Sequence, residues 1–375
     1  MESPQSNVPA TTAPESVPPA PPTASSVLPS SPSPEPPRIA VVVNGRAKNV
    51  TAEVISTLGQ ILSGGDLFVS RSLSDAKEIA KTLVQRRYGT VLTGGGDGTF
   101  TVMVTEVVHE ARRTGRPLPR FGLLKLGTGN SLAWVVGAGE VKGGELDADI
   151  EHLAQHAGSR TLRLIEVEGI ISPFCGLGAD ARVLADYGAV KERLSRGRLG
   201  RRLAPGAVSY TVAAVTRSLP QQVLGRMPHC RIVNAGEPVL RMGAKGSVVG
   251  RPIERGEVVY EGPARLAAMS TIPYYGYGFR MFPYAEERPD RMHLRVATIS
   301  PLQFVRHFAE IWRGSFEDPG SVFDYLVEAI DIELDPPTPF QIGGDSRGDR
   351  SKLHVALCKN PVELVDLYAP PSVPA

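Results

Sequence analysis

The sequence predicts an α/β protein with two folded parts that follow a tail of different composition. Strand-like and helix-like segments alternate from residue 38 to about residue 138, which favours a parallel sheet covered by helices. Beyond about residue 160 many short strand-like runs are separated by Gly and Pro, which favours an antiparallel sheet. We therefore expect a tail over residues 1–37, an α/β domain over residues 38–160 and a mainly antiparallel β domain over residues 161–370.

The tail is built mostly from Pro, Ser and Ala, with few bulky apolar residues. Such a composition cannot bury enough surface to offset the entropy of ordering, so we expect disorder. The tail lacks an apolar core flanked by positive charge, so we do not expect a secretory signal. A solvated tail and a polyproline-type ligand for a small partner domain both remain open.

The α/β part is predicted element by element from hydrophobic periodicity and capping residues. Buried strands are expected at Arg38–Asn44, Asp66–Ser70, Gly89–Gly95 and Arg120–Leu126. Helices are expected at Asn49–Ser63, Ser74–Arg87 and Phe100–Arg113, and a further helix opens at Asn130 with Trp134 in the core. In sheets of this kind ligands bind at the carboxyl ends of the strands.

The second part is predicted from short β-rich runs. These runs are Thr161–Gly169, Ile171–Val183, His229–Gly236, Val239–Gly250, Ala264–Gly276, Arg291–Ile299, Ala329–Pro337 and Leu353–Lys359. Helical patterns surround Lys191 and Tyr210. Together these runs predict a second, mainly antiparallel β domain.

Charge and cysteine content limit the classes of function. A net charge of +2 over 375 residues is too small to imply a nucleic-acid partner. The three cysteines are widely spaced and odd in number, which argues against a disulfide framework or a zinc site and fits a reducing compartment. No apolar run approaches the roughly 20 residues that span a bilayer. We expect a cytoplasmic protein that meets a membrane only at its periphery.

The stretch "VLTGGGDGTF", Val91–Phe100, places glycines around one carboxylate directly after a predicted strand. Glycines allow several peptide N–H groups to converge, and a following helix N-terminus favours negative charge, so this loop suits phosphate. Asp97 would repel phosphate unless it holds a metal ion or a proton. The GxxxxGK[ST] pattern is absent from this stretch, and an ordinary glycine turn remains the alternative.

A second polar loop follows the next strand. The stretch "LLKLGTGNSLAWVVG" begins at Leu123 and again places Gly, Thr and Asn between a strand and a helix. Because both strands belong to one parallel sheet, the two loops can face each other across a single cleft.

The pair "GGDGT" and "GTGN", about thirty residues apart, resembles the diacylglycerol kinase catalytic-domain superfamily. That superfamily includes bacterial lipid kinases, sphingosine and ceramide kinases and, more remotely, NAD kinases. The similarity runs from about Arg38 to Leu367. It implies an NAD kinase/diacylglycerol kinase-like fold, ATP and Mg²⁺ as cofactors, and phosphorylation of a lipid hydroxyl at a membrane surface.

The resemblance also implies roles for individual residues. Asp345, in "FQIGGDS", stands where the family has the Glu that accepts the hydroxyl proton, and Asp97 would organise magnesium. Asp290 stands in a turn that the family ties to a structural magnesium. The implied nucleotide contacts are Asn44, Ser70, Gly95, Gly96, Asp97, Gly98, Thr99, Thr128, Gly129 and Asn130.

Several positions depart from the family pattern. Thr101 and Val102 replace an Asn-Glu pair, Ser131 replaces the Asp of "GTGND", and Gly343 replaces the first Asp of Asp-Gly-Glu. Gly45 and Arg291 replace a Pro and a Gly of the same pattern. These changes keep two alternatives open: a nucleotide- or lipid-binding relative with weak or no kinase activity, and a kinase for a polar substrate such as NAD.

Two further stretches have both a functional and a plain interpretation. Lys191–Arg202 is strongly basic and either docks on anionic lipid headgroups or is a solvated surface. Ile272–Tyr284 is rich in aromatic residues and either lines an acyl-chain cleft, contacts a membrane or packs in the second domain's core.

Overall fold

The computed structural model describes residues 38–47, 50–61, 66–126, 130–136, 158–179, 181, 227–275 and 278–366. Residues 1–36 form one unit and residues 37–375 form the other, and only the second contains described residues. The predicted tail and the basic stretch Lys191–Arg202 lie outside the described ranges.

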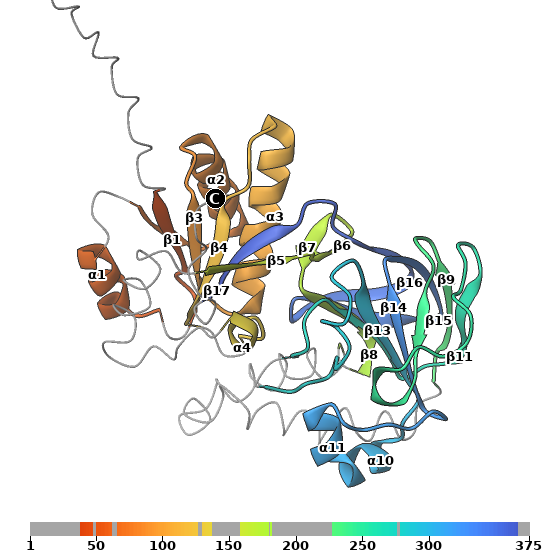
Figure 1. Cartoon of the computed structure of the whole chain (residues 1–375). Coiled ribbons are helices and arrows are strands. Elements are labelled where there is room, and N and C mark those ends of the chain that lie inside the picture. Colours follow the sequence, from red (N-terminus) through yellow and green to blue (C-terminus); the bar gives the residue numbers. More distant parts are fainter. Residues whose placement is uncertain are drawn as a thin grey trace, which may run out of the picture. The chain divides into compact units, whose positions relative to one another are not determined.

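The first sheet has six strands in the order β2-β1-β3-β4-β17-β5 (Figure 1). Its parallel part comprises β1 (Ile39–Asn44), β2 (Leu67–Ser70), β3 (Thr90–Gly95), β4 (Arg120–Lys125) and β17 (Val362–Asp366), and β5 (Gly158–Leu162) pairs antiparallel to β17. The predicted parallel sheet is confirmed. The strands of this sheet come from both sides of residue 160 in the sequence. The division of the chain into two domains at residue 160 stays a prediction.

The helices of this part are α1 (Ala52–Ile61), α2 (Leu73–Gln85), α3 (Asp97–Thr114) and α4 (Ala133–Val136). Ser72 caps α2 by accepting a hydrogen bond from the Asp75 N–H. Apolar residues on the inner faces of α2 and α3, including Leu83 and Val104, pack with Val42 and Phe121 of the sheet in one core. The strand–helix alternation places the loops after β1, β3 and β4 at one edge of the sheet.

The second sheet is antiparallel and has eleven strands. Its main path is β10-β14-β13-β12-β8-β15-β16-β6-β7, and β9 joins β15 to β11. The bounds are β6 (Ile165–Val167), β7 (Ile170–Ser172), β8 (Phe174–Gly178), β9 (His229–Asn234), β10 (Leu240–Met242), β11 (Val258–Pro263), β12 (Leu266–Ser270), β13 (Met292–Ala297), β14 (Val322–Val327), β15 (Ala329–Ile342) and β16 (Asp345–Leu357). A 3₁₀ turn, η2, spans Ala244–Gly246. The predicted antiparallel β part is confirmed.

Some elements were not expected from periodicity. Strands β11, β14 and β17 fall outside the predicted runs, and so do the short helices α10 (Pro301–Arg306) and α11 (Phe308–Arg313). The expectation that Trp134 is in the core is wrong, because half of its surface is exposed. α4 is only four residues long and cannot cover the whole indole ring. Within the described ranges, no helix is both long and apolar enough to span a bilayer.

Candidate functional site

The candidate site lies at the N-terminus of α3. β3 is buried along its whole length and ends at Gly95, and α3 begins two residues later at Asp97. Gly96 is the N-cap, so no side chain satisfies the N–H groups of the first turn. An 18-residue helix with an uncapped N-terminus favours a bound anion, because its free N–H groups and its dipole point to the same place.

The glycine loop is held to the end of β1 by a side-chain hydrogen bond. The Asn44 Nδ2 donates to the Thr99 Oγ1 over 3.1 Å, and the Asn44 Oδ1 accepts from the Arg46 N–H. A Cβ on Gly95 would collide with the Thr99 hydroxyl, so this glycine is needed for packing. Asn44 and Thr99, both predicted site residues, are therefore in direct contact.

Asp97 connects the two predicted loops. Its carboxylate accepts the Ser131 N–H at 2.7 and 3.0 Å and the Ser131 Oγ–H at 2.8 Å. Burial raises the pKa of Asp97, and the hydrogen bonds from Ser131 offset only part of that effect. Asn130, which has a positive φ of 42°, precedes Ser131 and is buried. Ser131 entered the sequence analysis only as a departure, yet here it orients Asp97.

Gly98 lies opposite Asp345. A Cβ built on Gly98 would lie 3.4 Å from Asp345 Oδ2 and 3.6 Å from Oδ1, and the structure places no closer atom there. Gly98 is inside α3, where alanine would fit and would favour the helix by about 1 kcal/mol. The absence of a side chain at Gly98 lets the Asp345 carboxylate lie next to the first turn of α3. A phosphate bound at the N-terminus of α3 would therefore be close to Asp345.

Asp345 is positioned by a β-hairpin. Gly343 and Gly344 connect β15 to β16 and have φ values of 57° and 84°, as a two-residue type I′ turn requires. Asp345 follows directly as the first residue of β16. Its side chain is 55% exposed, yet partial burial raises its pKa, and Arg347 at 3.8 Å offsets only part of the rise. A carboxyl with a raised pKa is suited to accept a proton.

Arg347 is a site residue that the sequence analysis did not find. Its guanidinium lies 3.8 Å from Asp345, and its Nε is buried without a hydrogen-bond partner. The Arg347 side chain is 35% exposed, so its guanidinium is accessible to a phosphate bound near Asp345. A basic residue two positions after Asp345 was the available signal.

Two of the departures from the family pattern face each other. A Cβ on Gly343 would collide with the Thr101 Oγ1 and lie 3.1 Å from the Ser172 Oγ. The Thr101 hydroxyl donates to the Ser172 Oγ over 3.2 Å. With Thr101 in place, position 343 has no room for an acidic side chain, so the two departures form one coupled change.

The remaining predicted residues fall into three groups. Ser70 pairs with Asn44 across β1 and β2 and therefore lies at the same edge of the sheet. Thr128 and Gly129 lie outside the described residues. Asp290 lies on a turn where Arg288 and Arg291 contact its carboxylate at 3.3 and 2.8 Å. Burial would raise the pKa of Asp290, but the charge of Arg291 and the contacts with Arg288 outweigh burial and lower it.

The described residues do not form a metal site by themselves. No group of three His, Cys, Asp or Glu side chains in these ranges could hold a metal ion. Magnesium in kinases is typically held by one or two carboxylates together with the phosphates of the substrate. Asp97 and Asp345 supply two carboxylates beside the glycine loop, so the residues present fit that mode of binding. The role of Asp290 as a metal ligand stays a prediction.

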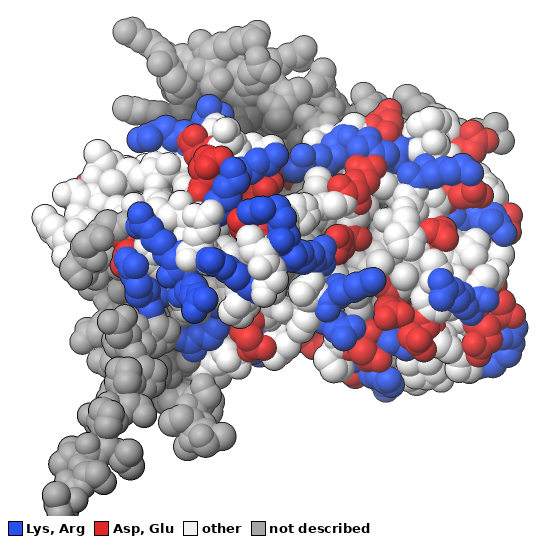
Figure 2. Space-filling model, turned by 90° about the horizontal axis from the view of Figure 1, so that it is seen from above, with Lys and Arg blue, Asp and Glu red and all other residues white. Residues whose placement is uncertain are grey.

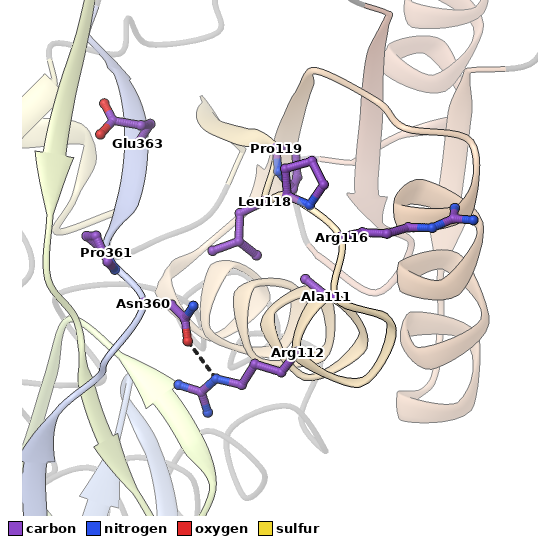
Figure 3. Close-up of a pocket in the computed structure, with 10 residues that line it drawn as sticks. Ala111, Arg112, Arg116, Leu118, Pro119, Asn360, Pro361 and Glu363 are labelled. Atoms are coloured by element: carbon purple, nitrogen blue, oxygen red, sulfur yellow. Dashed lines mark hydrogen bonds between the residues drawn. The ribbon is translucent and has the colours of Figure 1, made fainter.

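A larger cavity lies at the other end of α3 (Figure 3). It has a volume of about 450 Å³ and is lined by Ala111, Arg112, Gly115–Pro119, Asn360, Pro361 and Glu363. At 1.5 Å per residue, Ala111 is about 20 Å from Asp97 along the helix. Arg112 points to Asn360 and donates to its Oδ1 at 2.7 Å, so this cavity borders a structural contact.

Comparison with known families and structures is consistent with this location. Residues 38–167 match the diacylglycerol kinase catalytic domain. This range contains the Asn44 contact, both polar loops and Asp97, and it ends before Asp345. The predicted resemblance is confirmed over this range. No curated protein sequence gives a significant match.

Solved structures support the fold over most of the chain. A diacylglycerol kinase from Bacillus anthracis str. Sterne has 16% identity and a TM-score of 0.56, covering 88% of this chain and 96% of its own. A candidate diacylglycerol kinase from the same organism has 15% identity and a TM-score of 0.57, covering 88% and 97%. An NAD kinase from Archaeoglobus fulgidus in complex with ATP has 12% identity and a TM-score of 0.40, covering 88% and 94%. The first two matches confirm the fold of a bacterial diacylglycerol kinase.

Proposed function

We propose that this chain, whose residues 38–167 are a diacylglycerol kinase catalytic domain, transfers the γ-phosphate of ATP to a hydroxyl of a diacylglycerol- or sphingoid-like lipid. The observation that carries the proposal is the close approach of the Asp345 carboxylate to Gly98, in the first turn of α3. A phosphate loop and a carboxylate with a raised pKa face each other there. Phosphoryl transfer requires this combination of charge neutralisation and a proton acceptor.

The glycine loop and α3 would bind the triphosphate. The N–H groups at the start of α3 would donate to phosphate oxygens, and Asn44 fixes the loop through Thr99. Arg347 would add a positive charge through the guanidinium that has an unsatisfied Nε. These contacts position the phosphate and neutralise charge that develops on its oxygens.

Asp345 would accept the proton of the lipid hydroxyl. Burial raises the pKa of Asp345 toward the working pH. The β15–β16 hairpin carries Asp345 and places its carboxylate next to Gly98 of the glycine loop. Asp97 would accept the hydrogen bonds of the Ser131 N–H and Oγ–H and so hold the second loop against the first. If magnesium binds, Asp97 is the carboxylate that would hold it together with the phosphates of ATP, and the ion would neutralise phosphate charge.

The direct test is phosphate transfer by the purified full-length chain. Radiolabelled ATP and magnesium would be supplied with diacylglycerol in mixed micelles, with sphingosine, or with NAD. Labelled product is expected with a lipid acceptor and not with NAD. Labelled NAD would instead identify a kinase for a polar substrate. ATP binding without transfer to any acceptor would identify an inactive nucleotide-binding relative, and either result would overturn the proposal.

A further inference from the structure

The helices α10 and α11 carry an exposed apolar surface with no role in the site described above. Five of the ten large hydrophobic side chains that are exposed within the described residues lie on these twelve residues. They are Leu302 (78% exposed), Val305 (60%), Phe308 (47%), Phe304 (36%) and Trp312 (36%), which we call the apolar ridge. Folded proteins rarely gather so much exposed apolar surface without a partner.

The ridge is a well-formed part of the fold. Ser300 and Gln303 form a capping box at the start of α10, and Gly314 ends α11 with a φ of 71°. Ile311 and Phe316 are buried and anchor the pair, and the Arg280 N–H donates to the Trp312 carbonyl at 3.0 Å. The apolar side chains therefore remain exposed on a fixed scaffold.

The rings of the ridge contact one another. Phe304, Phe308 and Trp312 are in successive contact, with ring centroids 5.7 and 5.4 Å apart. A hollow of about 320 Å³ lies among Phe308, Ala309, Trp312 and Arg313. Leu302 and Val305, the two most exposed residues of the ridge, do not line this hollow and are free to contact a lipid phase.

The charges beside the ridge are mostly basic. Arg306 and Arg313 are exposed at the C-terminal ends of the two helices. The one acidic residue within α10 and α11, Glu310, already lies 2.9 Å from His307. By contrast, Figure 2 shows a face on which acidic and basic side chains are interspersed. Aromatic and aliphatic side chains flanked by arginine are typical of segments that lie in a membrane interface.

A chain of aromatic contacts connects the ridge to the candidate site. Phe279 stacks on Trp312 with ring centroids 5.3 Å apart and an interplanar angle of 14°. A Cβ on the preceding Gly278 would lie 3.4 Å from the ring of Trp134, which is half exposed and also contacts Tyr274. Trp134 follows Ser131, the partner of Asp97, by three residues.

We propose that the ridge on α10 and α11 inserts into the surface of an anionic lipid bilayer and so presents the site at α3 to the membrane. The purpose of this insertion rests on the proposed lipid kinase function, whereas the binding to the bilayer does not depend on it. Insertion of the apolar side chains would provide hydrophobic attachment, and Arg306 and Arg313 would contact the headgroups. The expected occupant is a phospholipid bilayer, not a second copy of the chain.

The test is vesicle co-sedimentation without ATP. Full-length wild type is expected to bind phosphatidylcholine vesicles that contain phosphatidylglycerol, and more weakly those without it. The double variant Leu302→Glu/Val305→Glu is expected to lose at least about tenfold in affinity, since it places charge where apolar side chains insert. The control is Val248→Glu/Val249→Glu, which changes two exposed valines outside the ridge (55% and 46% exposed) and should bind as wild type.

A second measurement separates this inference from the kinase proposal. The Leu302→Glu/Val305→Glu variant should phosphorylate a short-chain, water-soluble diacylglycerol as wild type does, and should lose activity only with vesicle-embedded substrate. If the wild-type protein binds vesicles but transfers no phosphate, only the kinase proposal is overturned. If the wild-type protein does not bind anionic vesicles, or if the ridge variant binds them as tightly as the control variant, the membrane-insertion proposal is overturned. A wild-type dimer that the ridge variant converts to a monomer would instead assign the ridge to self-association.

Discussion

The two ends of α3 differ in how completely their polar groups are satisfied. At the C-terminal end, Gly115 caps the helix in the left-handed region, and Arg112 donates to Glu166 at 2.9 and 2.8 Å and to Asn360 at 2.7 Å. At the N-terminal end, Gly96 offers no side-chain cap, and burial raises the pKa of Asp97. The polar groups at the C-terminal end of α3 have partners within the fold, whereas the N-terminal end has no side-chain cap and is available to a ligand.

This difference matters because the larger cavity lies at the satisfied end. The residues around it already have partners, so its volume reflects loose packing between α3 and the segment before β17. The N-terminal end has no side-chain cap and lies beside two carboxyls whose pKa values are raised. These features favour the N-terminal end as the candidate site.

The largest expected effect comes from removing the proposed base at the N-terminal end. Asp345→Asn should lower the rate of phosphate transfer by at least about 100-fold, because the amide cannot accept the hydroxyl proton. Folding stability should stay the same or rise slightly, since a carboxyl with a raised pKa destabilises the fold at neutral pH. Single-turnover transfer and thermal unfolding measure the two effects.

Asp349→Asn is the matched control for that change. Asp349 lies four residues further along β16 and is exposed, so its loss should leave transfer unchanged. If the Asp345 and Asp349 variants transfer phosphate at equal rates, Asp345 is not the general base. The same assay on Asp97→Asn should also show a large loss, because Ser131 would no longer hold a carboxylate.

The coupled departures at positions 101 and 343 predict the next largest effect. Gly343→Asp should destabilise the fold by about 3 kcal/mol, because the residue has a positive φ and its Cβ would collide with Thr101. Adding Thr101→Ala should recover part of the loss. Urea unfolding of the two single variants and the double variant would measure the coupling, and strictly additive effects would refute it.

At the satisfied end, Arg112→Ala should cost stability but not catalysis. Loss of its hydrogen bonds to Glu166 and Asn360 is expected to reduce unfolding free energy by about 1–3 kcal/mol with kcat unchanged. Arg251→Ala, which removes an equally bidentate but more exposed pair with Glu257, should cost less stability than Arg112→Ala because solvent screens the exposed pair. A lower kcat for Arg112→Ala would contradict a purely structural role for the C-terminal end of α3.

A smaller effect is expected from a buried histidine far from α3. His293 is fully buried, and burial lowers its pKa despite the Asp324 carboxylate at 2.9 Å. The unfolded chain binds a proton more readily, so this group should favour folding above about pH 6.5 and lose that contribution as pH falls. His293→Asn should flatten the stability profile between about pH 5 and pH 7. An unchanged slope would contradict the pKa direction.

The sequence predicted the local parts of the site well. Each polar loop follows a strand whose apolar run is continuous in sequence, so the strand–loop–helix units and their shared edge could be predicted. The same local patterns predicted that the first strands run parallel to one another; they did not predict the order of the strands in the sheet. Asn44, Ser70 and residues 95–99 then lie together because parallel strands end at one edge.

Features set by distant pairings could not be predicted from local patterns. Periodicity near residue 345 does not bring Asp345 to Gly98; only the family resemblance of "FQIGGDS" implied it, and the contact itself depends on the long β15–β16 hairpin. The role of Ser131 depends on Asp97, thirty-four residues earlier. β17 reaches the first sheet from the far end of the chain, and the six-residue helices α10 and α11 are too short for periodicity to identify.

A pair of glycine substitutions at the two ends of α3 tests the central claim most directly. Gly98→Ala adds a methyl group beside Asp345 at a helical position, and Gly115→Ala adds one at the left-handed cap of the other end. Calorimetric titration with magnesium and ATP should show binding to wild type and to Gly115→Ala, and loss of binding by at least about tenfold in Gly98→Ala. If Gly98→Ala binds ATP as tightly as wild type, or if wild type binds none, the N-terminus of α3 is not a phosphate site.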